Sequence, residues 1–454
     1  MDTKNKEYAE ALNPSSEDDI KSSMASTVIE PSDRFLFNYF MFLLFGIVLI
    51  LPFNALILSI GFFESNLPGR DIEFVVSTLT NVPIFIGQIL MLFISGFLNL
   101  KATIIFSLFG MAGCCMAIPF LTEHITSINT LWIVILISIA IFCFFSGVLQ
   151  SCAYGYAGIF PQRNIASLSN GTGMSGVVIG ILRAISLLSF PVDNDIPRDP
   201  NLFTGAILYY SISTAFCIIL IVLILISFRT EYSLFYLEGK NDSQAQKRID
   251  SIDNLMKSHQ SFTIAISNRK SLARQSMKSL GEEDEEKASI LKVHRDNWLN
   301  LWGIFLNFVI TMVMYPGLLL QGNLSFIEEI DWKVWFVIIL FVASDTVGRV
   351  LAGFLTLKSP IICGILTLLR SGNVAVAFLS AYDISFFGTD YVVIINIIIS
   401  GFGLGYLVTS QILTACTIPK PYEMELTGKM INIFLQIGIV VGSLIATFGL
   451  STLF

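Results

Sequence analysis

Residues 332–357, WKVWFVIILFVASDTVGRVLAGFLTL, decide the fold of this chain. The stretch is apolar and longer than the about 20 residues that a helix needs to cross a bilayer. Asp345 and Arg349 lie near its middle, four residues apart, so they share one face of a helix. Charges at such depth are costly and face a bundle interior or a water-filled cavity. The stretch therefore predicts a membrane-spanning helix with a polar face.

The composition of the whole chain agrees with a membrane protein. Hydrophobic residues make up 54% and charged residues 13% of the 454 residues, and the mean hydropathy is +0.73. Soluble domains carry roughly 25% charged residues. A water-soluble core could not hide this much apolar surface, so the lipid bilayer is the expected partner. The net charge is −7, and the sequence shows no basic pattern typical of nucleic-acid binding.

Stretches of membrane-spanning length recur along the sequence and predict an all-α integral membrane protein. We expect eleven spans, at residues 36–62, 72–98, 102–122, 130–156, 168–190, 203–228, 298–320, 332–357, 361–381, 390–417 and 426–452.

Polar segments divide these spans into four regions. We expect a disordered cytosolic tail at 1–34, a six-helix bundle at 35–228, a flexible cytosolic loop at 229–297 and a five-helix bundle at 298–454. The loop is rich in Ser, Lys and Asp, a composition typical of disorder.

An odd number of spans places the two termini on opposite sides of the membrane. With a cytosolic N-terminus and an extracellular C-terminus, the short inner loops hold more Lys and Arg than the outer ones, as the positive-inside rule requires. The inner residues are Lys101, Arg163, Lys358, Lys420 and Lys429, against Arg70, Arg198 and Lys333 outside. No retention signal or organelle address is evident, so we expect the plasma membrane. We also expect a monomer.

The sequence gives no sign of an enzyme, a cofactor site or a metal site. It contains no phosphate-binding loop, no His-Glu-x-x-His and no paired-cysteine zinc spacing. All seven cysteines fall in apolar segments and the three histidines lie in or beside loops. An intramembrane enzyme would need a buried nucleophile–base or metal-ligand set, and a seven-helix receptor conflicts with the span count.

Polar residues inside the spans are the candidate ligand contacts. A carboxylate acceptor at Asp345, a guanidinium donor at Arg349 and an amide at Gln150 suit a neutral, polyhydroxylated ligand. Asp345 and Arg349 could instead form an ion pair that locks the eighth span to its neighbours. For Arg183 and Arg370, the sequence favours helix packing or bonding to carbonyl groups.

Small residues and prolines indicate where spans pack closely or bend. Gly173 and Gly176 belong to a small-residue face of the fifth span, which permits close backbone approach. Pro52, Pro83 and Pro316 interrupt helix hydrogen bonding in the first, second and seventh spans.

These motifs, taken in order, resemble those of the equilibrative nucleoside transporter family. The resemblance covers nearly all of the spans. It rests on Leu51-Pro52-Phe53-Asn54; Gln150 with Gly155, Gly158 and Pro161; Gly171-Thr172-Gly173-Met174-Ser175-Gly176; Leu182-Arg183; Tyr315-Pro316; Asp345-x-x-Gly348-Arg349; Arg370; Gly405-Tyr406; and Glu425-x-x-Gly428 with Gly438 and Gly442.

The resemblance implies a 6+5, major-facilitator-like bundle that carries a nucleoside or nucleobase by alternating access, without a cofactor. Asp345 and Arg349 would contact polar atoms of the ribose or base, and Gln150 the base. Phe53 would form an aromatic wall, and Asn54 would hold the first helix. Pro316, Arg183, Arg370, Gly173 and Gly176 would serve structure and gating.

Three positions depart from the family pattern and bear on selectivity. Phe53 replaces the usual Trp, Thr172 replaces Gln, and Leu404 stands where many members have Asn. A facilitative uniporter is the leading interpretation. A proton-coupled symporter, in which Asp345 titrates between states, stays open at this point.

Overall fold

The computed structural model describes residues 31–68, 72–191, 200–237, 289–315, 317–327, 329–419 and 423–450. Within these ranges, eleven helices are long and apolar enough to cross a membrane. The prediction of an all-α membrane protein with eleven spans is confirmed. Pro316 lies outside the described residues, as do residues 1–30 of the expected tail and residues 238–288 of the expected loop.

The first half of the chain contributes six spans. After a short 3-10 turn at Arg34–Leu36, the helices are α3 (Phe37–Leu58), α4 (Ile60–Asn66), α5 (Ile72–Ile94), α6 (Leu100–His124), α7 (Ile128–Ile159), α8 (Gln162–Ser189) and α9 (Pro200–Ser227). The turn between α5 and α6 is short because Asn99 caps α6, where its Oδ1 accepts from the Ala102 N–H at 3.3 Å.

The second half contributes five spans. Its helices are α12 (Ile290–Met314), α13 (Gly317–Gln321), α14 (Ile330–Phe354), α15 (Pro360–Arg370), α16 (Gly372–Ala381), α17 (Asp390–Ala415) and α18 (Met424–Ile445). Ser359 caps α15 through its hydroxyl oxygen, and Pro360 occupies the first turn, where no backbone N–H is needed.

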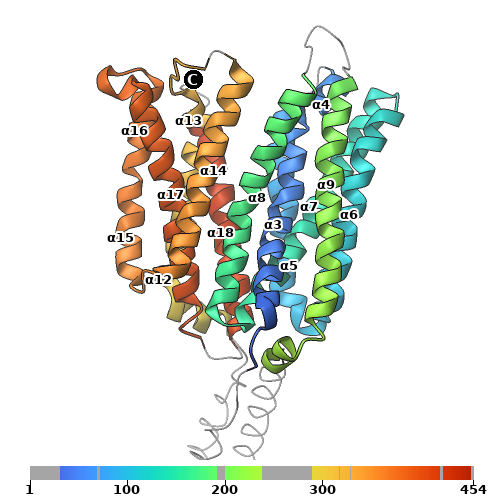
Figure 1. Cartoon of the computed structure of the whole chain (residues 1–454), viewed down its shortest axis with the longest axis vertical. Helices are drawn as coiled ribbons and strands as arrows, with labels where there is room; N and C mark the ends of the chain where they lie inside the picture. Colours follow the sequence, from blue (N-terminus) through green and yellow to red (C-terminus); the bar gives the residue numbers. More distant parts are fainter. Residues whose placement is uncertain are drawn as a thin grey trace, which may run out of the picture.

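The two sets of helices form two bundles side by side (Figure 1). Two seams join the bundles: α8 packs against α14, and α5 and α7 pack against α18. We call these the α8–α14 seam and the α18 seam. The end of the molecule where α3 begins and α9 ends is the lower end in Figure 1.

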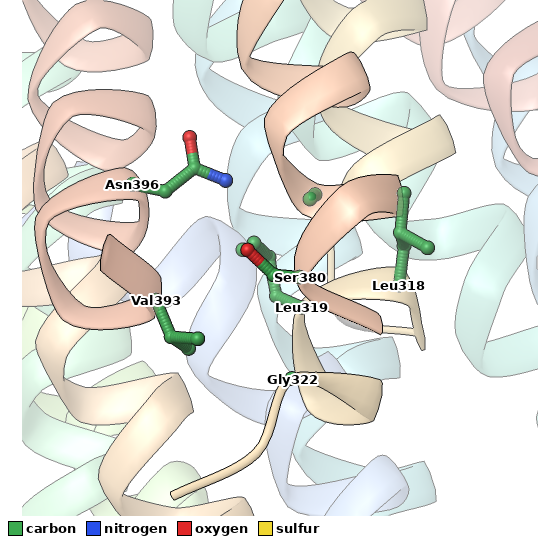
Figure 2. Close-up of a pocket in the computed structure, with 7 residues that line it drawn as sticks. Leu318, Leu319, Gly322, Ser380, Val393 and Asn396 are labelled. Carbon is green, nitrogen blue, oxygen red and sulfur yellow. The ribbon is translucent and has the colours of Figure 1, made fainter. Parts of the chain in front are cut away.

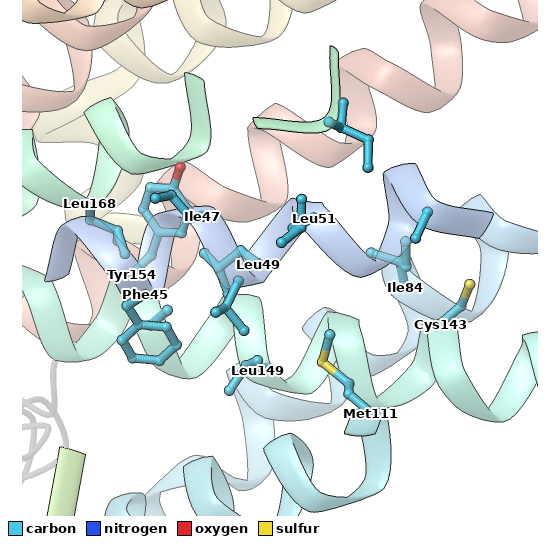
Figure 3. Packing of buried hydrophobic residues seen from close by; sticks show 14 of the residues in the cluster. Phe45, Ile47, Leu49, Leu51, Ile84, Met111, Cys143, Leu149, Tyr154 and Leu168 are labelled. Atoms are coloured by element: carbon cyan, nitrogen blue, oxygen red, sulfur yellow. The ribbon is translucent and has the colours of Figure 1, made fainter. Parts of the chain in front are cut away.

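Inside the six-helix bundle, apolar side chains from five helices interlock (Figure 3). They include Phe45, Leu49 and Leu51 of α3, Ile84 of α5, Met111 of α6, Cys143 and Leu149 of α7, and Leu168 of α8, all buried. The backbones approach closely at Gly46 and Gly171, where a Cβ would collide with the main chain of the opposite helix. This packing fixes the position of α3 against α8.

Several helix ends differ from the expected spans. The first span ends at Leu58, where Ser59 breaks the helix, and α4 follows as a separate piece. The ninth span is divided at Ser371 into α15 and α16. The helices α8 and α12 begin earlier than the apolar runs predict, at Gln162 and Ile290, because a helix can continue into polar sequence beyond the bilayer.

The described ends of the expected loop are helical. Residues 231–237 form a short helix beneath the six-helix bundle, and residues 290–297 belong to α12. Tyr232 anchors the short helix, since its hydroxyl accepts from Arg163 Nη2 and from Asn164 Nδ2, both at 3.1 Å. The loop therefore begins from a fixed position next to the turn between α7 and α8.

Candidate functional site

Arg349 lies on the face of α14 that packs against α8, and Asp345 lies one turn before it, where its main-chain carbonyl packs against Gly405 of α17. Gly173, Gly176 and Gly180 of α8 line the contact between α8 and α14. A Cβ at Gly173 would lie 2.7 Å from Arg349 Cδ, and a Cβ at Gly176 would lie 2.8 Å from Val342. Any larger residue would push the helices apart, so the glycine face of α8 brings the two bundles together at the charged pair.

Arg349 makes bonds both within its own helix and across to the other bundle. Its Nε donates to Asp345 Oδ2 at 2.8 Å. Its Nη1 donates to Ser169 Oγ and to Thr172 Oγ1, both at 3.1 Å, and to the Ser169 carbonyl at 3.3 Å. Arg349 therefore joins α14 to α8 while it holds one oxygen of Asp345.

The other oxygen of Asp345 is available. Both Asp345 and Arg349 are 6% exposed, and Asp345 Oδ1 has no hydrogen-bond partner among the described residues. A buried carboxylate oxygen without a partner is costly, and such an atom in a native site calls for a ligand or a water. The pair thus offers one unoccupied acceptor next to the Arg349 side chain that joins the two bundles.

Arg370 lies at the break between α15 and α16 and bonds mainly to main-chain groups. Its Nη2 donates to Thr311 Oγ1 at 2.8 Å and to the Ser400 carbonyl at 3.0 Å, and its Nη1 donates to the Asn307 carbonyl at 3.1 Å. Arg370 therefore ties α12 and α17 to the broken ninth span.

Phe53 and Asn54 follow Pro52 in α3 and are half-buried. Asn54 Nδ2 donates to Ser175 Oγ of α8 at 3.4 Å. This bond fixes the polar turn of α3 to the helix that carries Gly173 and Gly176.

Gln150 bonds to α5 and to its own helix, inside the six-helix bundle. Its Oε1 accepts from Gln88 Nε2 at 3.0 Å, and its Nε2 donates to Ser146 Oγ at 3.2 Å. On the same helix α5, Asn81 Oδ1 accepts from Gln436 Nε2 of α18 at 3.3 Å, which crosses the α18 seam. Hydrogen bonds thus link Gln150 to α5, and Arg349 to α8.

Arg183 lies farther along α8, in the wall of a small cavity inside the six-helix bundle. Ser59, Ser186, Asn201 and Tyr209 also line this cavity. Eleven residues of helix separate Arg183 from Thr172, or about 16 Å at 1.5 Å per residue. Arg183 is therefore remote from the Asp345–Arg349 pair.

A second cavity lies inside the five-helix bundle, between α13, α16 and α17 (Figure 2). Ser380 and Asn396 are its polar residues, and Asn396 Nδ2 donates to the Asn373 carbonyl at 3.2 Å. Neither Asp345 nor Arg349 lines it.

The sequence did not single out Ser169, Gln88, Asn432 or Gln436. Ser169 is one of many serines, and nothing local indicates that it faces an arginine of the other bundle. Asn432 and Gln436 carry a usable signal, because two amides four residues apart in an apolar run share one helix face.

Comparison with known proteins gives the family. A family model described as nucleoside transporter matches residues 136–449. The chain belongs to the nucleoside transporter family. The family places it among multi-pass membrane transporters and not among enzymes, which confirms the resemblance in the motifs.

Relatives of this transporter that match over most of their length share about one fifth of its residues. Human equilibrative nucleoside transporter 4 is 22% identical over 92% of this chain and 83% of its own length. Mouse equilibrative nucleoside transporter 2 is 22% identical over 91% and 96%, respectively. Equilibrative nucleotide transporter 1 of Arabidopsis thaliana is 21% identical over 93% and 88%.

Solved structures confirm the 6+5, major-facilitator-like fold of the transporter. The proton:xylose symporter XylE superposes with a TM-score of 0.58 at 12% identity, over 92% of this chain and 89% of XylE. The E. coli fucose:proton symporter FucP superposes with a TM-score of 0.57 at 10% identity, over 91% and 92%. At such identity the likeness concerns the fold alone.

Proposed function

We propose that this transporter carries nucleosides by facilitative uniport, through a site between the two bundles centred on Asp345. The observation that carries the proposal is the buried, unpartnered Asp345 Oδ1, which belongs to the carboxylate that holds Arg349 where α14 meets α8. An ionised carboxylate can accept hydrogen bonds but cannot donate them, and each ribose hydroxyl of a nucleoside can donate one. Asp345 Oδ1 then binds the sugar.

Arg349 is suited to a carrier that alternates between two states. Its Nε bond to Asp345 lies within one helix and persists when the bundles move. Its Nη1 bonds to Ser169 and Thr172 cross the seam and must break when α8 and α14 separate. A guanidinium offers several donors in a fixed plane, so Arg349 exchanges these hydroxyls for ligand atoms.

The remaining predicted residues take supporting roles in this proposal. Phe53 forms an apolar wall beside the ligand, and Asn54 holds α3 through Ser175. Gln150 contacts the base. Arg370 and the α8 glycines, Gly173 and Gly176, set the positions of α14 and α17. Nucleobases without a sugar are a second possible substrate class.

For the orientation, we infer a cytosolic N-terminus and an extracellular C-terminus, with residues 1–34 and the loop 229–297 on the cytosolic side. Support comes from the basic residues at the lower end, which include Lys101 and Arg163 in the first turns of α6 and α8, and Lys358 just before α15. We further propose that the transporter acts as a monomer in the plasma membrane.

The experiment is uptake of labelled adenosine and uridine into liposomes that contain the purified transporter. Uniport predicts that internal nucleoside rises to the external concentration and stops there, with or without an imposed pH gradient. Accumulation that follows the pH gradient would replace uniport by proton symport. Uptake no faster than in protein-free liposomes would remove nucleoside transport itself.

A further inference from the structure

The α18 seam holds amide side chains that the proposed sugar contact does not use. At one end of the contact, the α18 backbone at Gly428 meets the Tyr154 carbonyl of α7, where a Cβ would collide with that oxygen. Two turns farther along α18, Gln436 donates to Asn81 of α5. These two contacts define the face of α18 that meets the other bundle.

Asn432 lies on this same face, midway between the two contacts. It is four residues from Gly428 and four from Gln436, and residues four apart lie one above the other on a helix. The Asn432 side chain is 1% exposed, yet neither its Oδ1 nor its Nδ2 has a hydrogen-bond partner among the described residues. A complete amide is therefore buried and unused between α5, α7 and α18.

The opposite wall of the seam contains further unused polar atoms. Ser151 of α7 is spaced four and seven residues from Gly155 and Gly158, and both of these glycines contact α18. Its Oγ is buried and has no partner in the described part of the chain. Gln88 Oε1 is buried and unpartnered as well. Buried polar atoms are almost always bonded, so each of these exceptions calls for an explanation, and a bound ligand supplies one.

Interhelical bonding would be the simpler role for amides in a membrane protein. Gln436 and Asn81 form such a bond, but Asn432 and Ser151 do not. Holding the seam closed therefore does not explain Asn432.

The α18 seam and the Asp345–Arg349 pair contact neighbouring helices of the six-helix bundle. The Tyr154 carbonyl of α7 meets Gly428 of α18, Arg349 bonds to Ser169 of α8, and α7 packs against α8. One ligand with two chemically different ends could reach both groups. A nucleoside has such ends: a sugar with hydroxyl groups, and a base whose edge places donors beside acceptors.

We propose that Asn432 and Gln436 of α18, together with Gln150 of α7, bind the edge of the nucleobase and determine which bases are preferred. This inference rests on the proposed nucleoside transport. An amide donates and accepts at once, so it can form a paired contact with adjacent donor and acceptor atoms of a base, as Asn and Gln do with adenine in nucleic-acid complexes. Asp345 offers only acceptors and remains with the sugar.

The test measures how well unlabelled nucleosides compete with labelled uptake in three variants. The panel is adenosine, inosine, guanosine, uridine and cytidine. Asn432→Leu keeps the branched shape of the side chain, Gln436→Leu shortens it by one atom, and both remove its hydrogen bonding. Asn396→Leu makes the same change in the cavity of Figure 2, away from the seam, and serves as the matched control.

We expect Asn432→Leu to change the affinity ratio between the best and worst bases by about tenfold or more, since losing a hydrogen-bonding partner in a polar site discriminates strongly between substrates. Gln436→Leu should shift the ratio in the same direction, and Asn396→Leu should leave it unchanged. Discrimination between adenosine and its 2′,3′-dideoxy analogue should stay as in the parent.

An unchanged order of bases in both α18 variants, with surface expression and uptake retained, would overturn the inference and leave nucleoside transport standing. Equal loss of affinity for every nucleoside would also overturn it. Failure of the parent protein to take up any nucleoside would instead reject the proposed function. If Asn432→Leu does not fold, Gln436→Leu carries the same test.

Discussion

The Arg349 contacts across the α8–α14 seam predict the effect of removing a single hydroxyl group. In Thr172→Val, the side chain keeps its shape but loses the oxygen that accepts from Arg349 Nη1 at 3.1 Å. The Nη1 group keeps its bonds to Ser169. The substitution therefore weakens the seam without leaving the guanidinium unsatisfied.

The magnitude follows from the type of bond. A hydrogen bond to a charged group contributes about 1.5–3 kcal/mol, and the remaining Ser169 contacts argue for the lower end of that range. A loss of about 1.5 kcal/mol, at 1.4 kcal/mol per tenfold, raises the population with a separated seam by about tenfold. The full loss falls on the closed seam, because the Thr172 bond joins α8 to α14 and is absent when these helices separate.

A cysteine at position 342 reports the separation, because Val342 packs against Gly176 in the closed seam. In a background without native cysteines, Val342→Cys should react with a membrane-impermeant maleimide about ten times faster when combined with Thr172→Val. Thr122→Val is the matched control, since the Thr122 hydroxyl bonds only within α6, to the Ile118 carbonyl. Equal labelling rates in the Thr172 variant, the control and the parent would refute the reasoning.

Three further substitutions test the packing around the site. Arg370→Lys keeps the charge but loses the planar set of donors, and should lower the free energy of unfolding by about 3 kcal/mol, measured by thermal unfolding in detergent. Gly428→Val places side-chain atoms against the Tyr154 carbonyl and should reduce the uptake rate by about tenfold at normal expression. Unchanged uptake would show that α7 and α18 can move apart without loss of function. Tyr232→Phe removes the acceptor for buried Asn164 and should cost about 1–2 kcal/mol of stability, with an unchanged melting temperature as the contrary result.

The number of spans and the buried charged pair could be predicted because both depend on local sequence. Apolar runs of membrane length give the spans, and the i, i+4 spacing puts Asp345 and Arg349 on one face. The ends of the helices were harder to predict from the sequence. His294, Arg295 and Asp296 lie in α12 below its apolar run, so hydropathy began the span at 298 while the helix begins at Ile290.

Contacts between the bundles could not be predicted from local sequence. Ser169 reaches Arg349 across 180 residues of chain, and no periodicity within α8 indicates this. The family resemblance gave roles to Gln150 and Asp345 but not their bonding partners, Gln88 and Ser146 for Gln150 and Arg349 for Asp345. The break at Ser371 has a local signal in the Ser371-Gly372 pair, but the bonds of Arg370 to α12 and α17 beside it are tertiary contacts.

The central claim is that Asp345 Oδ1 binds the ribose hydroxyls. The most direct measurement compares adenosine with 2′,3′-dideoxyadenosine as competitors of uptake, in the parent and in Asp345→Asn. A hydrogen bond to a charged acceptor of about 1.5–3 kcal/mol corresponds to a preference for adenosine of about 10- to 150-fold in the parent. The account predicts that Asp345→Asn loses most of this preference and keeps the order of bases. An equal loss of affinity for both compounds, with the preference intact, would contradict it.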